Sequence, residues 1–133
     1  VYERMSLYRE LDNVRDEEEL SRFENKLIDR FGQLPDQTRN LLLLVRLRWV
    51  AISLGFEKLT LKQNRMAGYF ITVENSPYFQ SDAFGKIINY YQTHVERCKL
   101  RDVAGKKSIL FNDVDTVDEA YQILNRVEET SSN

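Results

Sequence analysis

The spacing of apolar residues changes once along the chain, and this change constrains the fold more than any other feature. From residue 2 to about residue 55, apolar residues recur every three or four positions, which is the period of a helix buried on one side. From Phe56 onward they alternate, as in strands with one buried face. Two alternating pairs are each followed by another helical stretch. The sequence therefore predicts helices followed by two hairpin-plus-helix units.

Three helices are expected in the first part, over residues 2–13, 17–31 and 36–54. Gly32 has the position of a left-handed C-cap residue, and Pro35 suits the first turn of the helix that follows. Gly55 ends that third helix, again as a C-cap. The third helix is apolar over so much of its circumference that it is expected to pack on more than one neighbour.

Four strands and two helices are expected in the second part. The strands are FEKLTLKQ (56–63), MAGYFITVE (66–74), CKLRDV (98–103) and KSILFND (107–113). Their turns are placed around Asn64 and Arg65 and at 104–106, and Ser81 and Thr116 are expected to cap the two helices. The predicted fold class is α+β: N-terminal helices followed by two ββα units, with a four-stranded, mostly antiparallel sheet packed against helices.

The length fits one domain, 1–133, with a helical part at 1–55, a ββαββα part at 56–130 and a frayed tail at 131–133. The first residue, Val1, already lies in a helical pattern, so we expect a piece excised from a longer protein. The formal net charge of −2 disfavours direct binding to nucleic acid. With one cysteine, no signal peptide and no apolar run of membrane length, the expected location is the cytoplasm, without membrane contact.

The residues that could carry chemistry all have a simpler explanation. AGKKS at 104–108 lacks the spacing of a phosphate-binding loop and suits a hairpin turn. His94 and Cys98 are only two soft ligands, and a zinc site needs more. The acidic cluster at 113–119 lies at a helix start, where capping explains it. No catalytic, cofactor-binding or metal-binding residue is predicted, and an enzyme is not expected.

Basic and aromatic side chains are mixed in the hairpin at 56–73, for example Lys62 and Arg65 with Tyr69 and Phe70. Single-strand-binding proteins use this combination to stack bases and to hold phosphates. Most of these aromatic residues are in phase with the apolar faces, so core packing is favoured. Nucleic-acid contact through this hairpin is the alternative function.

The second helix has two contrasting sides. One is an apolar stripe, expected to be buried, that consists of Leu20, Phe23, Leu27, Ile28 and Phe31. The opposite side carries Glu18, Arg22, Asn25 and Asp29, with Lys26 and Arg30 on its flank. This polar side is left to solvent or to a partner.

Residues 10–59 resemble the C-terminal domain of the bacterial transcription-repair coupling factors. The residues that carry the resemblance are LIDRFG-x-LP at 27–35, the leucine-rich helix after it, and LGFEKL at 54–59. The resemblance implies a regulatory domain of an ATP-driven translocase on double-stranded DNA that displaces stalled RNA polymerase and recruits nucleotide excision repair. It also implies that ATP and magnesium bind to the motor domains of the parent protein and not to this chain.

The same resemblance implies a partner and contact residues. The domain would pack on the UvrB-like N-terminal domain of the same protein, mask its UvrA-binding surface and restrain the motor until RNA polymerase is engaged. We expect the contact at Asp29 and Arg30 first, and then at Lys26 and Arg22. Lys26 departs from the acidic residue expected there in other members, so Glu18, Glu19 or Glu24 would supply negative charge instead.

Overall fold

The computed structural model describes residues 2–132, and side chains from residue 6 onward. The chain divides into two compact units, Val1–Leu42 and Leu43–Asn133, which we call the helical unit and the sheet unit. The boundary falls inside a helix. Each unit is described by itself.

The helical unit contains α1 (Tyr2–Asp12), α2 (Glu17–Phe31) and the first part of α3 (Asp36–Ser53). Asp16 caps α2, because its carboxylate accepts the Glu19 N–H at 2.8 Å while the Glu19 carboxylate accepts the Arg15 N–H at 2.9 Å. Gly32 ends α2 with φ 81°, and its N–H donates to the Ile28 carbonyl at 2.8 Å. The expected position of the C-cap is confirmed, but with ψ −155° the Gly32 backbone lies outside the left-handed helical region that was predicted. The buried residues of this unit are Leu11, Leu20, Phe23, Leu27, Leu34 and Leu42.

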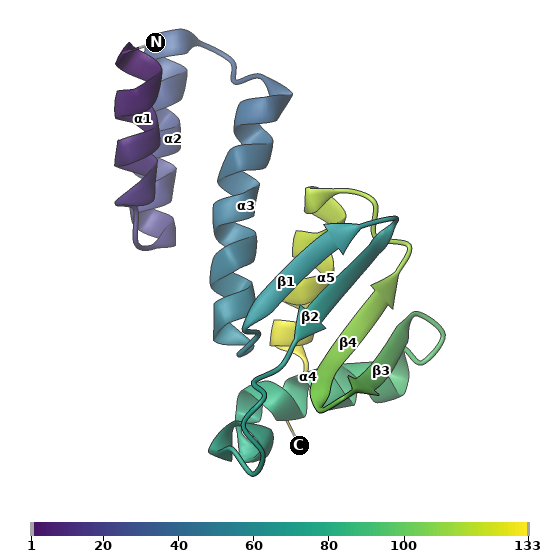
Figure 1. The fold of residues 1–133 in the computed structure, drawn as a ribbon. Helices are drawn as coiled ribbons and strands as arrows, with labels where there is room; N and C mark the ends of the chain where they lie inside the picture. The colour runs from purple at the N-terminus through teal and green to yellow at the C-terminus, as the bar shows by residue number, and fades with distance from the viewer. Residues whose placement is uncertain (1, 133) are drawn as a thin grey trace. The chain divides into compact units, whose positions relative to one another are not determined.

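The sheet unit continues from the end of α3 and holds all the strands. Its elements are β1 (Lys58–Lys62), β2 (Arg65–Tyr69), the 3-10 helix η1 (Pro77–Gln80), α4 (Asp82–Thr93), β3 (Cys98–Val103), β4 (Lys106–Asn112) and α5 (Val117–Glu129). The strand order is β1-β2-β4-β3, and every neighbouring pair is antiparallel (Figure 1). The predicted α+β class and four-stranded sheet are therefore confirmed.

Both hairpins have two-residue turns with positive φ angles. The residues are Gln63 and Asn64 (53° and 62°) in the first hairpin and Ala104 and Gly105 (54° and 82°) in the second. This backbone matches the twist of the flanking strands. Arg65 and Lys106, which the sequence placed in the turns, are instead the first residues of β2 and β4.

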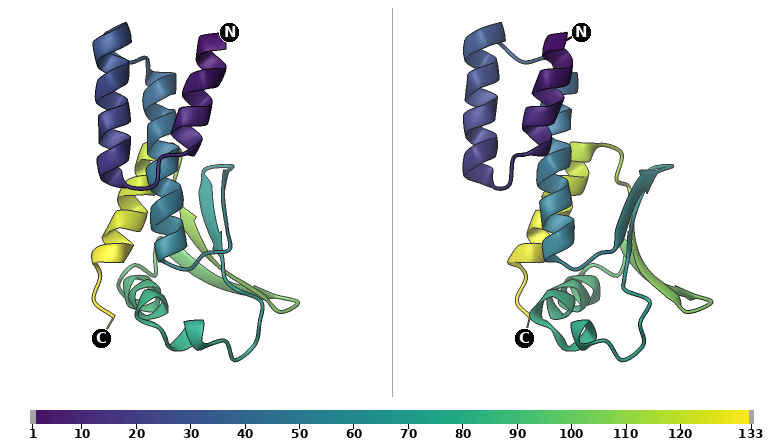
Figure 2. Two further views of the ribbon diagram at one scale, coloured as in Figure 1. Left: turned by 90° about the vertical axis from the view of Figure 1, so that its left-hand side faces the viewer. Right: turned by 60° about the vertical axis from the view of Figure 1, so that its left-hand side comes forward.

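Helices cover one face of the sheet in this unit, and its other face carries no helix of residues 43–132 (Figure 2). The core lies between the sheet and the helices. Its largest fully buried side chains are Leu54, Met66, Ile87, Ile109, Phe111, Val114, Leu124 and Val127. No described helix is long and apolar enough to span a bilayer.

Two boundaries differ from the prediction. β2 ends at Tyr69 and not at residue 74. β1 begins at Lys58, which pairs with Tyr69, so β2 has no partner on that side beyond this residue. On the other side the Phe70 N–H donates to the carbonyl of Lys107, close to the start of β4 at Lys106. The helical pattern SDAFGKIINYYQTHV predicts a helix that reaches Val95, but α4 ends at Thr93 and Val95 is exposed. The predicted caps Ser81 and Thr116 are confirmed.

Candidate interdomain contact surface

The four predicted contact residues lie on one side of α2. Arg22, Lys26 and Asp29 are four and three positions apart, so they stack along the helix, with Arg30 next to Lys26. All four side chains are exposed, while Leu20, Phe23 and Leu27 on the opposite side are buried. The structure thus brings the four residues together on a surface that we call the α2 ridge.

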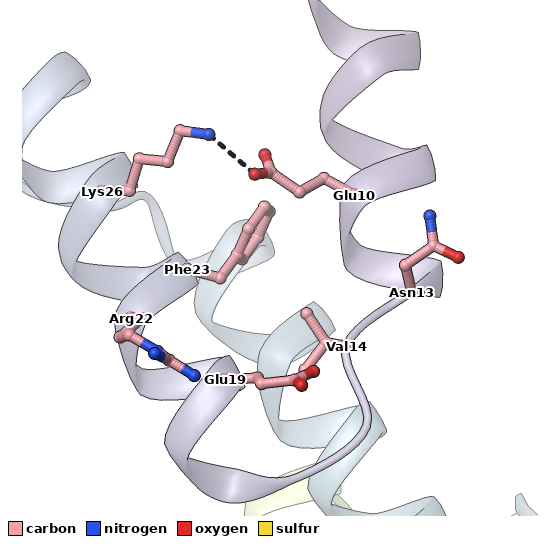
Figure 3. A pocket seen from close by; sticks show the side chains of 7 residues that line it. All are labelled: Glu10, Asn13, Val14, Glu19, Arg22, Phe23 and Lys26. Atoms are coloured by element: carbon pink, nitrogen blue, oxygen red, sulfur yellow. Dashed lines mark hydrogen bonds and ion pairs between the residues drawn. The ribbon is translucent and has the colours of Figure 1, made fainter.

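Lys26 is already engaged inside the helical unit. Its Nζ lies 2.7 Å from a carboxylate oxygen of Glu10 on α1 (Figure 3). The two side chains are 55% and 41% exposed, so water screens the pair and its contribution to stability is below about 1 kcal/mol. Lys26 is therefore a weak link between α1 and α2, and this leaves it available to a competing carboxylate.

A hollow of about 300 Å³ lies beside this ion pair. Figure 3 shows Lys26 and Glu10 pointing toward each other across it, with Phe23 between the two helices and Arg22 farther along α2. The other lining residues are Asn13, Val14 and Glu19. Sequence reasoning missed Glu10, because the meeting of residues on two helices depends on how each helix is rotated. The one signal for it was its charge, which is opposite to that of Lys26.

Asp29 has no interaction partner among the described side chains. It lies in the last turn of α2, where the carbonyl end of the helix dipole disfavours a carboxylate. The described side chains, those of residues 6–132, include no partner that offsets this cost through a hydrogen bond or ion pair with the Asp29 carboxylate. A helix end that tolerates an unfavourable charge is consistent with a carboxylate kept for an external partner.

Arg30 lies beside exposed apolar surface. Its guanidinium carbon is 5.4 Å from the centroid of the Phe31 ring. Phe31 is 50% exposed and Ile28 is 42% exposed, so the expectation that both belong to the buried stripe was wrong. The stripe narrows toward the helix end, where Gly32 stops the helix and the chain turns away. The end of α2 thus presents apolar and charged groups together.

The other candidate residues have structural positions. The Thr116 hydroxyl accepts the Glu119 N–H at 3.1 Å, and the Glu119 carboxylate accepts the Asp115 N–H at 3.0 Å, so the acidic cluster contains a helix cap. His94 ends α4 and its ring stacks on Tyr90, 3.8 Å between centroids. Burial raises the pKa of the Cys98 thiol to about 11. Among the described residues no three His, Cys, Asp or Glu side chains gather as a metal site would require.

Comparison with known sequences gives one consistent result. The profile of the TRCF domain family matches residues 1–81. A transcription-repair-coupling factor of Rickettsia bellii (strain RML369-C) is 31% identical over 98 residues, which are 74% of this chain and 8% of that protein. The transcription-repair-coupling factor of Escherichia coli (strain K12) is 46% identical over 59 residues, 44% of this chain and 5% of that protein. The chain thus matches less than a tenth of the length of these relatives.

A solved structure shares the fold. It is described as the crystal structure of the C-terminal domain of transcription-repair coupling factor, and it aligns with a TM-score of 0.72. The alignment covers 97% of this chain and 81% of the other, at 15% sequence identity. At that identity the likeness concerns the fold alone.

Proposed function

The chain belongs to the TRCF domain family, and on this premise we propose that it acts as the regulatory C-terminal domain of a transcription-repair-coupling factor. In this role it is a non-catalytic clamp. It packs on the UvrB-like N-terminal domain of the same protein, covers the surface that binds UvrA, and restrains the translocase until RNA polymerase is engaged. ATP and magnesium are used by the motor domains, and this domain needs neither.

The observation that carries the proposal is the end of α2. Asp29 lies at an unfavourable place in the helix and has no offsetting interaction in the described residues. Beside it, Ile28 and Phe31 are 42% and 50% exposed. Charged groups that border exposed apolar groups are suited to a contact in which the apolar groups contribute affinity and the charges fix orientation. The C-cap at Gly32 holds this end in place.

A clamp must also open, which favours a modest interface. Interfaces between domains of one chain bury about 600–1,500 Å² and are more polar than permanent ones. Such a contact can be displaced by a few kcal/mol of competing binding energy. The weak pair between Lys26 and Glu10 fits this requirement, because exchanging one exposed partner for another changes little free energy.

Binding in trans tests the partner. The 133-residue chain is titrated into an isolated UvrB-like domain in a calorimeter, as wild type and as the double variant Asp29→Ala/Arg30→Ala. We expect the double variant to bind at least tenfold more weakly, since about 1.4 kcal/mol corresponds to tenfold. The matched control, Arg126→Ala/Glu129→Ala, removes one exposed charge of each sign from α5 and is expected to bind within twofold of wild type. If the two variants lose the same affinity, the α2 ridge is not the contact surface.

Hydrolysis of ATP by a full-length coupling factor that carries this domain tests the restraint. If the domain is a clamp, the Asp29→Ala/Arg30→Ala variant and a deletion of the whole domain both hydrolyse ATP faster and bind UvrA without polymerase. If only the deletion raises these two activities, the domain is still a clamp, but its contact does not involve Asp29 and Arg30. If the deletion releases neither activity, the domain is not autoinhibitory.

A further inference from the structure

The face of the sheet that carries no helix of the sheet unit is strongly basic. Alternation along the strands, fixed by the register, sends every second side chain to this face. Six of them are exposed Lys or Arg side chains: Lys58, Lys62, Arg65, Lys99, Arg101 and Lys106. No Asp or Glu occupies an outward position in the four described strands. We call this surface the open face.

Four of the six positive charges of the open face lie on its two edge strands, and Arg65 and Lys106 are the first residues of the central strands β2 and β4. Lys58 and Lys62 lie on β1, which is one edge of the sheet, and Lys99 and Arg101 lie on β3, which is the other. Three strand spacings separate these edges, about 14 Å in all. The registers place Lys58 and Arg101 at opposite ends of one row, through Tyr69 and Ser108. A negatively charged chain lying along the sheet would therefore meet cations on both sides.

The middle of the surface between the two edges is neutral, because Arg65 and Lys106 lie at the ends of the central strands. There, β2 and β4 contribute Ala67, Tyr69, Ser108 and Leu110 to the open face. Ala67 and Ser108 are small and each is only 6% exposed, so they offer a ligand little surface. Tyr69 provides the aromatic ring there, and Lys58 Nζ is 5.7 Å from its centroid. The open face thus has basic edges and one partly exposed aromatic ring between them.

The carboxylates that bring the chain to −2 lie elsewhere. Asp102, the acidic residue within β3, alternates to the helix side and pairs in register with Lys107. Five further carboxylates lie in the first turns of α2 and α5. The expectation of no nucleic-acid contact used the summed charge, but a ligand experiences the local field, which on the open face is positive. Within the hairpin of the alternative function, Phe56 and Phe70 are buried and offer no stacking surface.

We propose that the open face binds a single-stranded nucleic acid, whose phosphates contact the basic edges and one of whose bases stacks on Tyr69. Grooves of positive charge with an aromatic platform are the general solution for unpaired strands, because each base offers a flat face and each phosphate a charge. A duplex hides its bases and would leave the Tyr69 ring unused. This proposal is independent of the clamp, since the two surfaces belong to different units of the chain.

Fluorescence anisotropy tests the proposal. The probes are a labelled 20-nucleotide oligo-dT and a labelled duplex of the same length, each titrated with the 133-residue chain at 50 and at 200 mM salt. Oligo-dT is expected to bind more tightly than duplex. Its affinity should fall with salt with a logarithmic slope of about −3, since each of four phosphate contacts contributes about 0.7 for single strands. Duplex affinity equal to or greater than that of oligo-dT would overturn the single-strand assignment.

Variants separate charge from stacking. Lys58→Gln/Arg101→Gln removes one cation from each edge, so it should weaken oligo-dT binding about tenfold and reduce the size of the slope by about 1.4. Tyr69→Leu should weaken binding at least fivefold and leave the slope unchanged. The control, Arg48→Gln/Arg126→Gln, removes two exposed cations from helices and should stay within twofold of wild type. No binding at 50 mM salt, or equal weakening by the control, would overturn the proposal.

Discussion

At the scale of single residues, Gly55 is the position with least tolerance for a side chain. It ends α3 with φ 86°, and a Cβ added there would overlap the Tyr78 ring. The ring is held in place, because its hydroxyl donates to the Leu54 carbonyl at 2.6 Å. Gly55→Ala combines backbone strain with overpacking, so we expect a loss of about 3 kcal/mol in the free energy of unfolding, measured with urea.

Gly32 provides the matched control for Gly55. It also ends a helix with positive φ, 81°, but a Cβ there would meet no atom within 4 Å. Gly32→Ala should therefore carry only backbone strain, about 2 kcal/mol, because φ 81° with ψ −155° is a conformation that essentially only glycine adopts. Equal losses in the two variants would mean that the Tyr78 ring moves aside without cost.

Cys98 makes the stability depend on alkaline pH. The folded thiol has a pKa of about 11 because it is buried, whereas the ordinary value is 9.0. The unfolded chain therefore loses this proton first, so stability is unaffected below pH 9 and falls as the pH rises toward 11. Compared with Cys98→Ala, the wild type should lose about 2 kcal/mol more of its free energy of unfolding between pH 8 and pH 10.5. Tyr78 titrates in both proteins, so its contribution cancels in the comparison. If the free energy of unfolding depends on pH in the same way in the two proteins, the prediction is wrong.

At the scale of elements, the type of each helix and strand could be predicted, but several boundaries could not. Burial on one side imposes a period on the sequence, and that period is readable locally. A strand end depends on its neighbours in the sheet. β2 stops at Tyr69 because β1 and β4 no longer flank it, although ITVE continues the alternation. The residues of β2 alone do not determine how it aligns with strands from other parts of the chain.

Some features of the candidate surfaces could likewise be predicted from one segment of the sequence, and others could not. The side of α2 that carries Arg22, Lys26, Asp29 and Arg30 follows from helical geometry within one segment, so it could be predicted. The Glu10 partner of Lys26 could not, because it depends on packing between two helices. Prediction of the open face would also have required the strand order. Alternation groups Lys58 with Lys62 and Lys99 with Arg101, but only the strand order places these pairs at opposite edges of one face.

At the scale of the whole molecule, the core of the sheet unit is complete without residues of the helical unit. Its cluster of buried residues begins at Leu47 and ends at Val127. We therefore expect a fragment of residues 43–133 to fold alone and to unfold cooperatively on heating, as followed by circular dichroism. The helical unit spans only 42 residues, near the size at which a chain rarely folds without help, so a fragment of residues 1–42 should be largely unfolded.

The cut at residue 43 also removes the first turns of α3, and a longer fragment separates the two effects. Residues 36–133 keep the whole of α3, Asp36–Ser53, and restore the helix start without α1 or α2. If the shorter fragment is unfolded and the longer one folds, the early turns of α3 are needed for its stability but the helical unit is not. If both are unfolded, the sheet unit depends on α1 and α2, and the independence inferred from its core is wrong.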